Sequence, residues 1–475
     1  MIFSSYSFLG FFIIIFVVFA VLNRLKLYSI SELWLTLASF YFYAQGSLAF
    51  LPYFMGTVFF NYAVGSLMIQ QNGKFAGINR KALFAIGLFE NIALLGYFKY
   101  TNFFIQNYNL ITGQTIIFKN ILLPIGISFF TFQLIAYLVD CYRGETKEYT
   151  IMNYLLFITF FPQLIVGPIV HHKDIVPQFE EGKQNGLIGR NIILGIFIFS
   201  IGCAKKTLLA DPLTAFAQDF FSNIYIGGLW KTWTAVFAYT FAYYFDLSGY
   251  ADMAIGLGLF FNIKLPQNFY SPYKARNFRD YWRRWHMTLS KFLSDYIFRS
   301  VYKKGGGSVR FYTAVMVTFL VSGFWHGAGW SFVLWGIING IFVCMAHFMS
   351  RRKWAMPFAL AWLLTFAGVL GTRVLFVSNT VKKSLFVYKA MFDFSELSGM
   401  ELSEILHYAG RFVAFNFYTI VVLLVAMGIA FFARNTEQIT DNFAPKLRHA
   451  IIAGLLLSLS LFQMSGVTEF LYFQF

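Results

Sequence analysis

The chain of 475 residues has 58% hydrophobic and only 12% charged side chains, a composition that excludes an ordinary soluble globular domain. Its formal net charge is +16, but the basic residues cluster between apolar stretches. That pattern excludes nucleic acid as the expected partner and favours anionic lipid or an anionic cytosolic ligand. Cys141, Cys203 and Cys344 lie at no ligand-like spacing, so they predict neither a disulfide framework nor a metal site.

Apolar stretches of about 15 to 22 residues recur along the whole chain, and each is long enough to span or enter a bilayer. The first stretch has no basic start and no small-residue cleavage site, so we expect a retained helix. No repeat or linker separates the stretches, which predicts one all-α, polytopic membrane domain over residues 1–475 with about 11–13 membrane segments. In chain order the segments are 2–22, 31–50, 52–70, 82–98, 119–139, 151–170, 189–209, 234–262, 311–325, 328–348, 355–377, 411–433 and 449–467.

Basic residues follow alternate crossings, and this asymmetry predicts the orientation of the chain. Placing these residues in the cytoplasm puts both termini on the outer side of the membrane. The segment 264–310 carries eleven Lys and Arg residues against only Asp280 and Asp295, and we expect it to be cytoplasmic.

Within this segment, the pattern of residues 282–301 predicts one helix at the inner membrane surface, opened near Asn277 and ended by Gly305–Gly307. Its apolar residues recur at spacings of three and four, which gives a single stripe. The stripe consists of Trp282, Trp285, Leu289, Leu293, Tyr296 and Ile297. His286 points along its buried side, whereas Arg283 and Arg284 lie mostly off it.

Segment 311–325 would rise only about 22 Å, less than a hydrocarbon core of about 30 Å. We therefore expect segments 311–325 and 328–348 to form a hairpin with its tip, 322–330, at membrane depth. Irregular backbone there must be buried in protein or line a cavity. This arrangement places His326 deep inside the membrane domain.

An ionisable side chain inside a bilayer is costly and is a functional candidate by default. Around His326, we expect Gly323, Gly327 and Gly329 to leave space beside the ring and Trp325 and Trp330 to wall it. A pKa of about 6.5 suits a histidine to proton transfer at neutral pH, so we predict a general base. The alternative is a neutral imidazole that is satisfied by a helix carbonyl.

Two further polar patterns interrupt apolar segments. Asp246 and Asp252 lie six residues apart in "YFDLSGYADMAIGLG", where they either hold helices together by hydrogen bonds or form a proton pathway. Pro162, Gly167 and Pro168 in "FFPQLIVGPIV" predict a helix break that shapes a cavity.

Four ordered motifs resemble one family over nearly the whole chain, most densely from 160 to 345. They are "FPQLIVGPI", "YFDLSGYADMAIGLG", "NFYSPYKARNFRDYWRRWHMTLSKFLSDYIF" and "GFWHGAGWSFVLWG". Together they resemble the membrane-bound O-acyltransferase family, and within it the bacterial branch that acetylates alginate and peptidoglycan. The resemblance implies that His326 is the buried catalytic histidine and His286 the second polar residue of the active site.

The resemblance also implies a tunnel that reaches the histidine from both sides, cytosolic acetyl-CoA as donor substrate and no permanently bound cofactor. A separate extracytoplasmic esterase-like transferase would pass the acetyl group to a sugar. We expect the substrates to be bound by the residues around the two histidines and in the central span, namely Trp282, Arg283, Arg284, Trp285, Trp325, Asp246 and Asp252.

The end of the chain, "EFLYFQF" (469–475), nearly spells a protease-cleavage tag, but Phe470 and Phe475 depart from one. It is similar to a motif F-x-Y-F-x-F of related envelope systems, in which the tyrosine accepts the acyl group. This resemblance implies that Tyr472 is a catalytic residue of a functional tail. The alternative is an aromatic plug that packs at the outer interface or docks a partner.

These patterns predict an acetyltransferase of a bacterial cytoplasmic membrane, acting for peptidoglycan O-acetylation. The composition, with 62 Phe residues, fits an AT-rich genome and favours peptidoglycan over alginate. Teichoic-acid D-alanylation is a third option. From other classes, a proton-coupled transporter would require internal repeats that the sequence does not show, and a scaffold would make the histidine purely structural.

Overall fold

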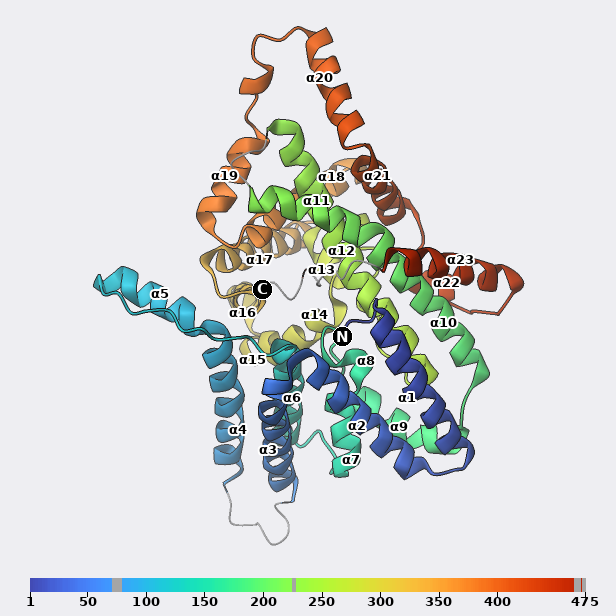
Figure 1. The fold of residues 1–475 in the computed structure, drawn as a ribbon. Coiled ribbons are helices and arrows are strands. Elements are labelled where there is room, and N and C mark those ends of the chain that lie inside the picture. The colour runs from blue at the N-terminus through green and yellow to red at the C-terminus, as the bar shows by residue number, and fades with distance from the viewer. Residues whose placement is uncertain (71–78, 224–227, 465–470, 472–475) are drawn as a thin grey trace. The chain divides into compact units, whose positions relative to one another are not determined.

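The computed structural model describes the whole chain except residues 71–78, 224–227, 465–470 and 472–475 (Figure 1). Every regular element in this described part is a helix, which confirms the all-α class. The residues form two compact units. Unit 1 comprises Met1–Ser200, Tyr250–Gln267 and Phe443–Ala453, and unit 2 comprises Ile201–Gly249, Asn268–Asn442 and Gly454–Phe475.

Seven helical runs of the described chain are long and apolar enough to cross a membrane, which confirms a multi-pass membrane protein. An eighth candidate is a pair of helices bent by 87°. The seven runs are Tyr6–Arg24, Leu48–Ile69, Arg80–Thr112, Gly189–Ser222, Gly307–His326, Trp330–Arg351 and Phe358–Val377.

Unit 1 is a helical assembly with a core rich in phenylalanine. Figure 1 shows α3, α4 and α6 side by side, and these three helices contact one another. Its helices are α1 (Tyr6–Arg24), α2 (Tyr28–Ser47), α3 (Leu51–Ile69), α4 (Arg80–Leu95), α5 (Thr101–Thr112), α6 (Ile127–Arg143), α7 (Ile151–Thr159), α8 (Phe161–Leu164) and α9 (His172–Asn185). Parts of α10 (Gly189–Ala204), α12 (Leu229–Phe260) and α23 (Leu447–Gln463) complete it.

Unit 2 contains the remaining parts of α10, α12 and α23 and both predicted active-site histidines. Its other helices are α11 (Asp211–Ser222), α13 (Phe278–Arg284), α14 (Met287–Phe292), α15 (Arg299–Val301), α16 (Gly307–His326), α17 (Trp330–Arg351), α18 (Phe358–Val377), α19 (Val381–Met391), α20 (Leu402–Phe415), α21 (Phe417–Phe432) and α22 (Thr436–Thr440). Two π-helical stretches, Lys205–Ala210 and Leu293–Phe298, extend α10 and α14.

Helices α16 and α17 pack against each other as the expected hairpin, but the first of them is longer than the segment 311–325. The depth of the hairpin tip in the membrane stays a prediction. Helix α16 starts at Gly307, before the apolar run, and continues to His326. At 1.5 Å per residue its 20 residues rise about 30 Å, enough to cross a hydrocarbon core. His326 therefore lies at the end of a full-length helix, directly before the turn 327–329.

The glycines around His326 serve close packing and do not leave the open space expected from the sequence. A Cβ atom on Gly323 would collide with the carbonyl oxygen of Phe332, and one on Gly327 would collide with the Phe332 ring. A Cβ on Gly336 would in turn collide with the carbonyl oxygen of Phe319. Small residues let α16 and α17 approach closely, as in other membrane helix pairs.

The single helix expected over residues 282–301 is broken near its start. Helix α13 ends at Arg284, and His286 adopts a left-handed conformation with φ of +46° before α14 begins. The expected start at Asn277 is confirmed, because its side-chain oxygen accepts a hydrogen bond from the Asp280 N–H at 2.8 Å.

Two other expected spans are also interrupted. The segment 151–170 breaks between α7 and α8, as Pro162 and Gly167 predicted, and a Cβ on Gly167 would collide with Gln163. The segment 411–433 does not form one helix, because Asn416 ends α20 by donating a side-chain hydrogen bond to the Phe412 carbonyl. Helix α21 then continues at an angle of 87°.

Candidate active site

The break at His286 is stabilised by a second stretch of backbone, residues 268–270. The Met287 N–H donates to the Asn268 carbonyl at 2.9 Å, and the Tyr270 N–H donates to the Arg284 carbonyl at 2.9 Å. The Thr288 N–H and hydroxyl both donate to the Asn268 side chain. A left-handed histidine is strained, and these bonds hold the strained backbone in place.

His326 is enclosed by aromatic rings and is only 3% exposed. Its ring centroid lies 4.8 Å from that of Trp325, 5.1 Å from that of Trp335 and 5.2 Å from that of Phe376. These rings come from α16, α17 and α18. Together they exclude water from the imidazole, which strengthens electrostatic interactions at this position.

The structure brings the two predicted catalytic histidines together. Trp325 contacts both imidazoles, with its centroid 6.3 Å from the ring of His286 and 4.8 Å from that of His326. His286 is also 3% exposed. Two buried imidazoles from separate segments of the chain are therefore neighbours of the same indole ring.

A cavity of about 300 Å³ is lined by neighbours of these histidines in the chain, although neither imidazole lines it. It is lined by Arg279, Trp282, Arg283, Leu289, Ser290, Leu293, Ser294, Phe298, Val315, Thr318, Phe319, Ser322 and Val343. Residues of the lining are linked to both histidines, by a hydrogen bond in one case and by an aromatic contact through Trp335 in the other. Ser290 donates its N–H to the His286 carbonyl, and the Trp282 ring lies 5.5 Å from Trp335, a neighbour of His326.

The predicted substrate-binding residues of the "WRRW" motif fall into two groups. Trp282 and Arg283 line the cavity. Arg284 instead pairs with Asp280, its Nε lying 2.8 Å from Oδ1. Trp285 belongs to an aromatic stack, in which its ring lies 5.7 Å from that of Tyr243.

Electrostatics distinguish His286 from an ordinary histidine. Burial lowers the pKa of His286 to about 3, so its imidazole is neutral at physiological pH. A neutral imidazole offers one donor and one acceptor nitrogen. At the cavity wall, partial burial and the neighbouring charge of Arg283 lower the pKa of Arg279. Two like charges held close together favour an anion between them.

Asp246 belongs to a buried charge cluster in unit 2. Its Oδ1 lies 2.6 Å from the Nζ of Lys206, which also lies 2.8 Å from an oxygen of Asp211. Its Oδ2 accepts a hydrogen bond from the backbone N–H of Leu471 at 3.1 Å. The carboxylate therefore links α12 to the tail directly before Tyr472. Tyr472 itself lies outside the described residues.

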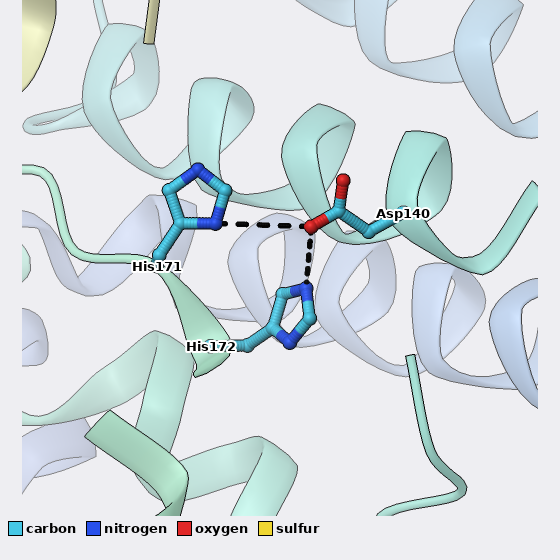
Figure 2. Close-up of side chains that lie close together, drawn as sticks. All are labelled: Asp140, His171 and His172. Atoms are coloured by element: carbon cyan, nitrogen blue, oxygen red, sulfur yellow. Dashed lines mark hydrogen bonds and ion pairs between the residues drawn. The ribbon is translucent and has the colours of Figure 1, made fainter. Parts of the chain in front are cut away.

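Asp252 is buried in the part of α12 that belongs to unit 1. Unit 1 contains a second polar cluster (Figure 2). The Oδ2 of Asp140 lies 2.9 Å from His172 Nε2, 3.7 Å from His171 Nδ1 and 3.3 Å from Lys173 Nζ. Asp140, His171 and His172 each offer one possible metal-ligand atom, and these atoms lie within 4.8 Å of one another. Lys173, however, already supplies a positive charge at this position. The predicted absence of a metal stays a prediction.

Sequence reasoning missed two buried cations of unit 2, Lys206 and Arg373. Both lie within long apolar segments and are almost fully buried. The sequence does contain a signal for both residues, because an ionisable side chain within a candidate membrane span is a functional candidate by default. Cys141 and Cys203 are buried, and the predicted absence of a disulfide framework stays a prediction.

Comparison with known proteins shows the family to which the chain belongs. The model of the membrane-bound O-acyltransferase family matches residues 2–374. A peptidoglycan O-acetyltransferase of Helicobacter pylori is 38% identical, over 94% of this chain and 91% of that protein. A probable alginate O-acetylase, AlgI, of Pseudomonas aeruginosa is 35% identical over 85% of this chain and 77% of that protein. A teichoic acid D-alanyltransferase of Streptococcus thermophilus is 28% identical over 48% of this chain and 58% of that protein.

The family match covers the motifs that position His286 and His326, and it agrees with a multi-pass helical fold that encloses both. The chain therefore belongs to the membrane-bound O-acyltransferase family and is an acyltransferase.

Proposed function

We propose that this chain takes acetyl groups from cytosolic acetyl-CoA and moves them across the bacterial cytoplasmic membrane for O-acetylation of peptidoglycan. The observation that carries the proposal is a cavity that contains Arg279 and Arg283 in its wall and is also lined by Ser322, about one helical turn before the buried His326. Similarity to the Helicobacter pylori enzyme favours peptidoglycan as the polymer. Alginate is the second candidate, because the alginate O-acetylases are similar over most of the chain.

The cavity suits the donor. Arg279 and Arg283 provide positive charge that attracts the phosphates of acetyl-CoA. The remaining lining is mostly apolar and fits the uncharged arm of the donor that carries the thioester. The indole N–H of Trp282 is buried without a hydrogen-bond partner among the described residues, so it is available to that arm.

The proposed acceptor is Tyr472 of the tail, and the hydrogen bond between Leu471 and Asp246 supports this role. His326 removes the phenol proton, the phenolate oxygen attacks the thioester carbonyl, and the C–S bond breaks. The proton leaves with the sulfur as the CoA thiol. A phenol has a pKa of about 10 and needs such a base at neutral pH. A separate extracytoplasmic esterase-like transferase then takes the acetyl group from the phenyl ester to the sugar.

The direct test is incubation of the purified protein with acetyl-CoA labelled in its acetyl group. We expect covalent label on the C-terminal peptide, located at Tyr472 by mass spectrometry, and none in Tyr472→Phe. A proton-coupled transporter would neither release CoA nor acquire label. Deleting the gene in its source should remove O-acetyl groups from isolated peptidoglycan, and an unchanged content there would exclude that polymer.

The tail contact has a sharper test, because proline lacks an N–H group. Leu471→Pro removes the donor to Asp246, whereas Leu471→Met keeps both the donor and an apolar side chain. We expect labelling to fall in the proline variant only. Equal labelling of both variants would show that this contact does not position Tyr472.

A further inference from the structure

Arg373 on α18 is a buried cation inside an aromatic cage. Its side chain belongs to unit 2, and the residue is 5% exposed. The guanidinium carbon lies 4.5 Å from the ring centroid of Tyr243, 4.9 Å from that of Trp285 and 5.5 Å from that of Phe376. Stacking on aromatic faces holds the plane of the guanidinium in a defined orientation.

No carboxylate among the described residues lies within ion-pair distance of this arginine. The hydrogen bond from its Nη2 to the Tyr281 hydroxyl is long, at 3.4 Å, and Tyr273 is its other hydrogen-bond partner in the described residues. Its Nε is buried without a partner in the described part of the chain. An arginine stays charged in proteins, and a buried charge without a full set of partners is costly. Such a cost is expected where the charge serves a ligand.

The cage of Arg373 is continuous with that of the catalytic base. The Phe376 ring contacts the guanidinium and also lies 5.2 Å from the ring of His326. Trp285, another ring of the cage, directly precedes His286. The guanidinium of Arg373 is thus in the same dry region as both histidines.

We propose that Arg373, assisted by Tyr281, forms an internal anion site that receives the negative charge of the acyl carbonyl oxygen during transfer. The inference rests on the proposed function. When the acceptor oxygen bonds to the thioester carbon, the carbonyl electron pair moves to its oxygen, and Arg373 donates a hydrogen bond to that oxyanion. The pair then re-forms the carbonyl as the C–S bond breaks, and the departing sulfur takes the proton from His326.

Arg373 could instead bind a phosphate group of the donor, but the cavity offers other arginines for the phosphates. Arg279 and Arg283 line the cavity and are partly exposed, as a hydrated phosphate requires. Arg373 lies among aromatic rings and is shielded from water. A preorganised donor in a dry site stabilises a transient oxyanion strongly.

The test combines three variants of the purified full chain: Arg373→Met, Arg373→Lys and, as a control with an exposed arginine, Arg411→Met. Rates of acetyl transfer from acetyl-CoA are measured per folded protein, together with the unfolding temperature. We expect Arg373→Met to lower kcat roughly 100- to 1000-fold, with KM for acetyl-CoA changed less than about threefold. Arg373→Lys, which keeps the charge, should lose about tenfold.

The unfolding temperature separates this role from a structural one. Removing an uncompensated buried charge should leave the temperature of Arg373→Met unchanged or raise it. A marked decrease with a normal rate per folded protein would make Arg373 structural and would overturn the proposal. A loss confined to KM would assign it to donor phosphates and would also overturn it. If Arg373→Met does not fold, a normal kcat in Arg373→Gln would overturn the proposal in the same way.

A second measurement does not depend on the donor. Sodium acetate, a planar anion, should raise the unfolding temperature of the wild type relative to sodium chloride at equal ionic strength, and should not do so in Arg373→Met. If acetate stabilises the wild type but the protein is inactive with acetyl-CoA, the proposed function is contradicted, whereas the anion site is still supported. Equal responses of wild type and variant to acetate would contradict the site itself.

Discussion

Among the individual residues of the site, two buried imidazoles have different chemical roles. His326 lies among aromatic rings, where a base can act without competition from water. His286 has its pKa lowered by burial to about 3, too low to hold a proton at neutral pH. We infer that His326 transfers the proton and that His286 positions a substrate through hydrogen bonds.

The first prediction concerns His326→Gln. Glutamine keeps a hydrogen-bonding side chain of similar length but cannot serve as a base, so acetyl transfer should fall about 10²- to 10⁴-fold. The amount of folded protein and its unfolding temperature should remain near those of the wild type. The rate of CoA release by the purified protein is the measurement, and near-normal release would exclude His326 as the base.

The second prediction separates positioning from proton transfer at His286. His286→Asn retains a donor and an acceptor and tolerates a left-handed backbone, whereas His286→Ala loses all three advantages. We expect the asparagine variant to keep more activity than the alanine variant, and the acid limb of the pH–rate profile to be the same as in the wild type. A shift of that limb in His286→Asn would show that His286 titrates during the reaction.

Between secondary-structure elements, the Asp140 cluster joins helix α6 to the start of α9. Burial alone would raise the pKa of Asp140, but the hydrogen bond from His172 and the charge of Lys173 lower it overall. The Nδ1 of His172 lies 2.9 Å from the Tyr149 hydroxyl, which orients the ring toward the carboxylate. The cluster is thus a charged clamp between two helices.

The third prediction follows from that clamp. Asp140→Asn should lower stability at neutral pH by about 1–3 kcal/mol, because the buried His172 loses a charged hydrogen-bond acceptor. A carboxyl group whose pKa is lowered by folding stabilises fully above its unfolded value of about 3.9, and this stabilisation is lost as pH falls through the folded value. Thermal unfolding from pH 7 to pH 3 should therefore show a wild-type advantage that shrinks only below about pH 4.

Glu181→Gln provides the control, because Glu181 is an exposed carboxylate on α9. Its stability should follow that of the wild type across the whole pH range. An Asp140→Asn protein as stable as the wild type at pH 7 would mean that the cluster does not clamp the helices.

For the complete protein, the orientation in the membrane decides which side supplies the donor. Basic residues are concentrated between residues 264 and 310, and the proposed donor cavity takes two arginines from this segment. Because basic loops are retained in the cytoplasm, we place this segment inside and both termini outside.

The fourth prediction tests this topology with single cysteines in a background without Cys141, Cys203 and Cys344. Lys304→Cys and Gln114→Cys both place the thiol at exposed positions. In intact spheroplasts, an impermeant maleimide should label Gln114→Cys, and it should label Lys304→Cys only after permeabilisation. Labelling of Lys304→Cys in intact spheroplasts would reverse the orientation and contradict a cytosolic donor.

The membrane class, the helical class and the family could all be predicted from the order of residues along the chain. Long apolar runs need no tertiary information, because a bilayer requires about 20 apolar residues per helix whatever the neighbours are. Ordered motifs such as "GFWHGAGWSFVLWG" likewise single out His326 as a candidate, because each motif is local in the chain.

The construction of the site depends instead on contacts in three dimensions. The break at His286 depends on hydrogen bonds from Asn268, and no periodicity within residues 282–301 contains that partner. In the sequence, Arg373 is only a single charge in an apolar span. The fold is needed to show that Tyr243, Trp285 and Phe376 surround it. The space beside the glycines next to His326 is filled by Phe332 from the facing helix. These features follow from contacts between distant segments, whereas hydropathy and periodicity report only on near neighbours in the chain.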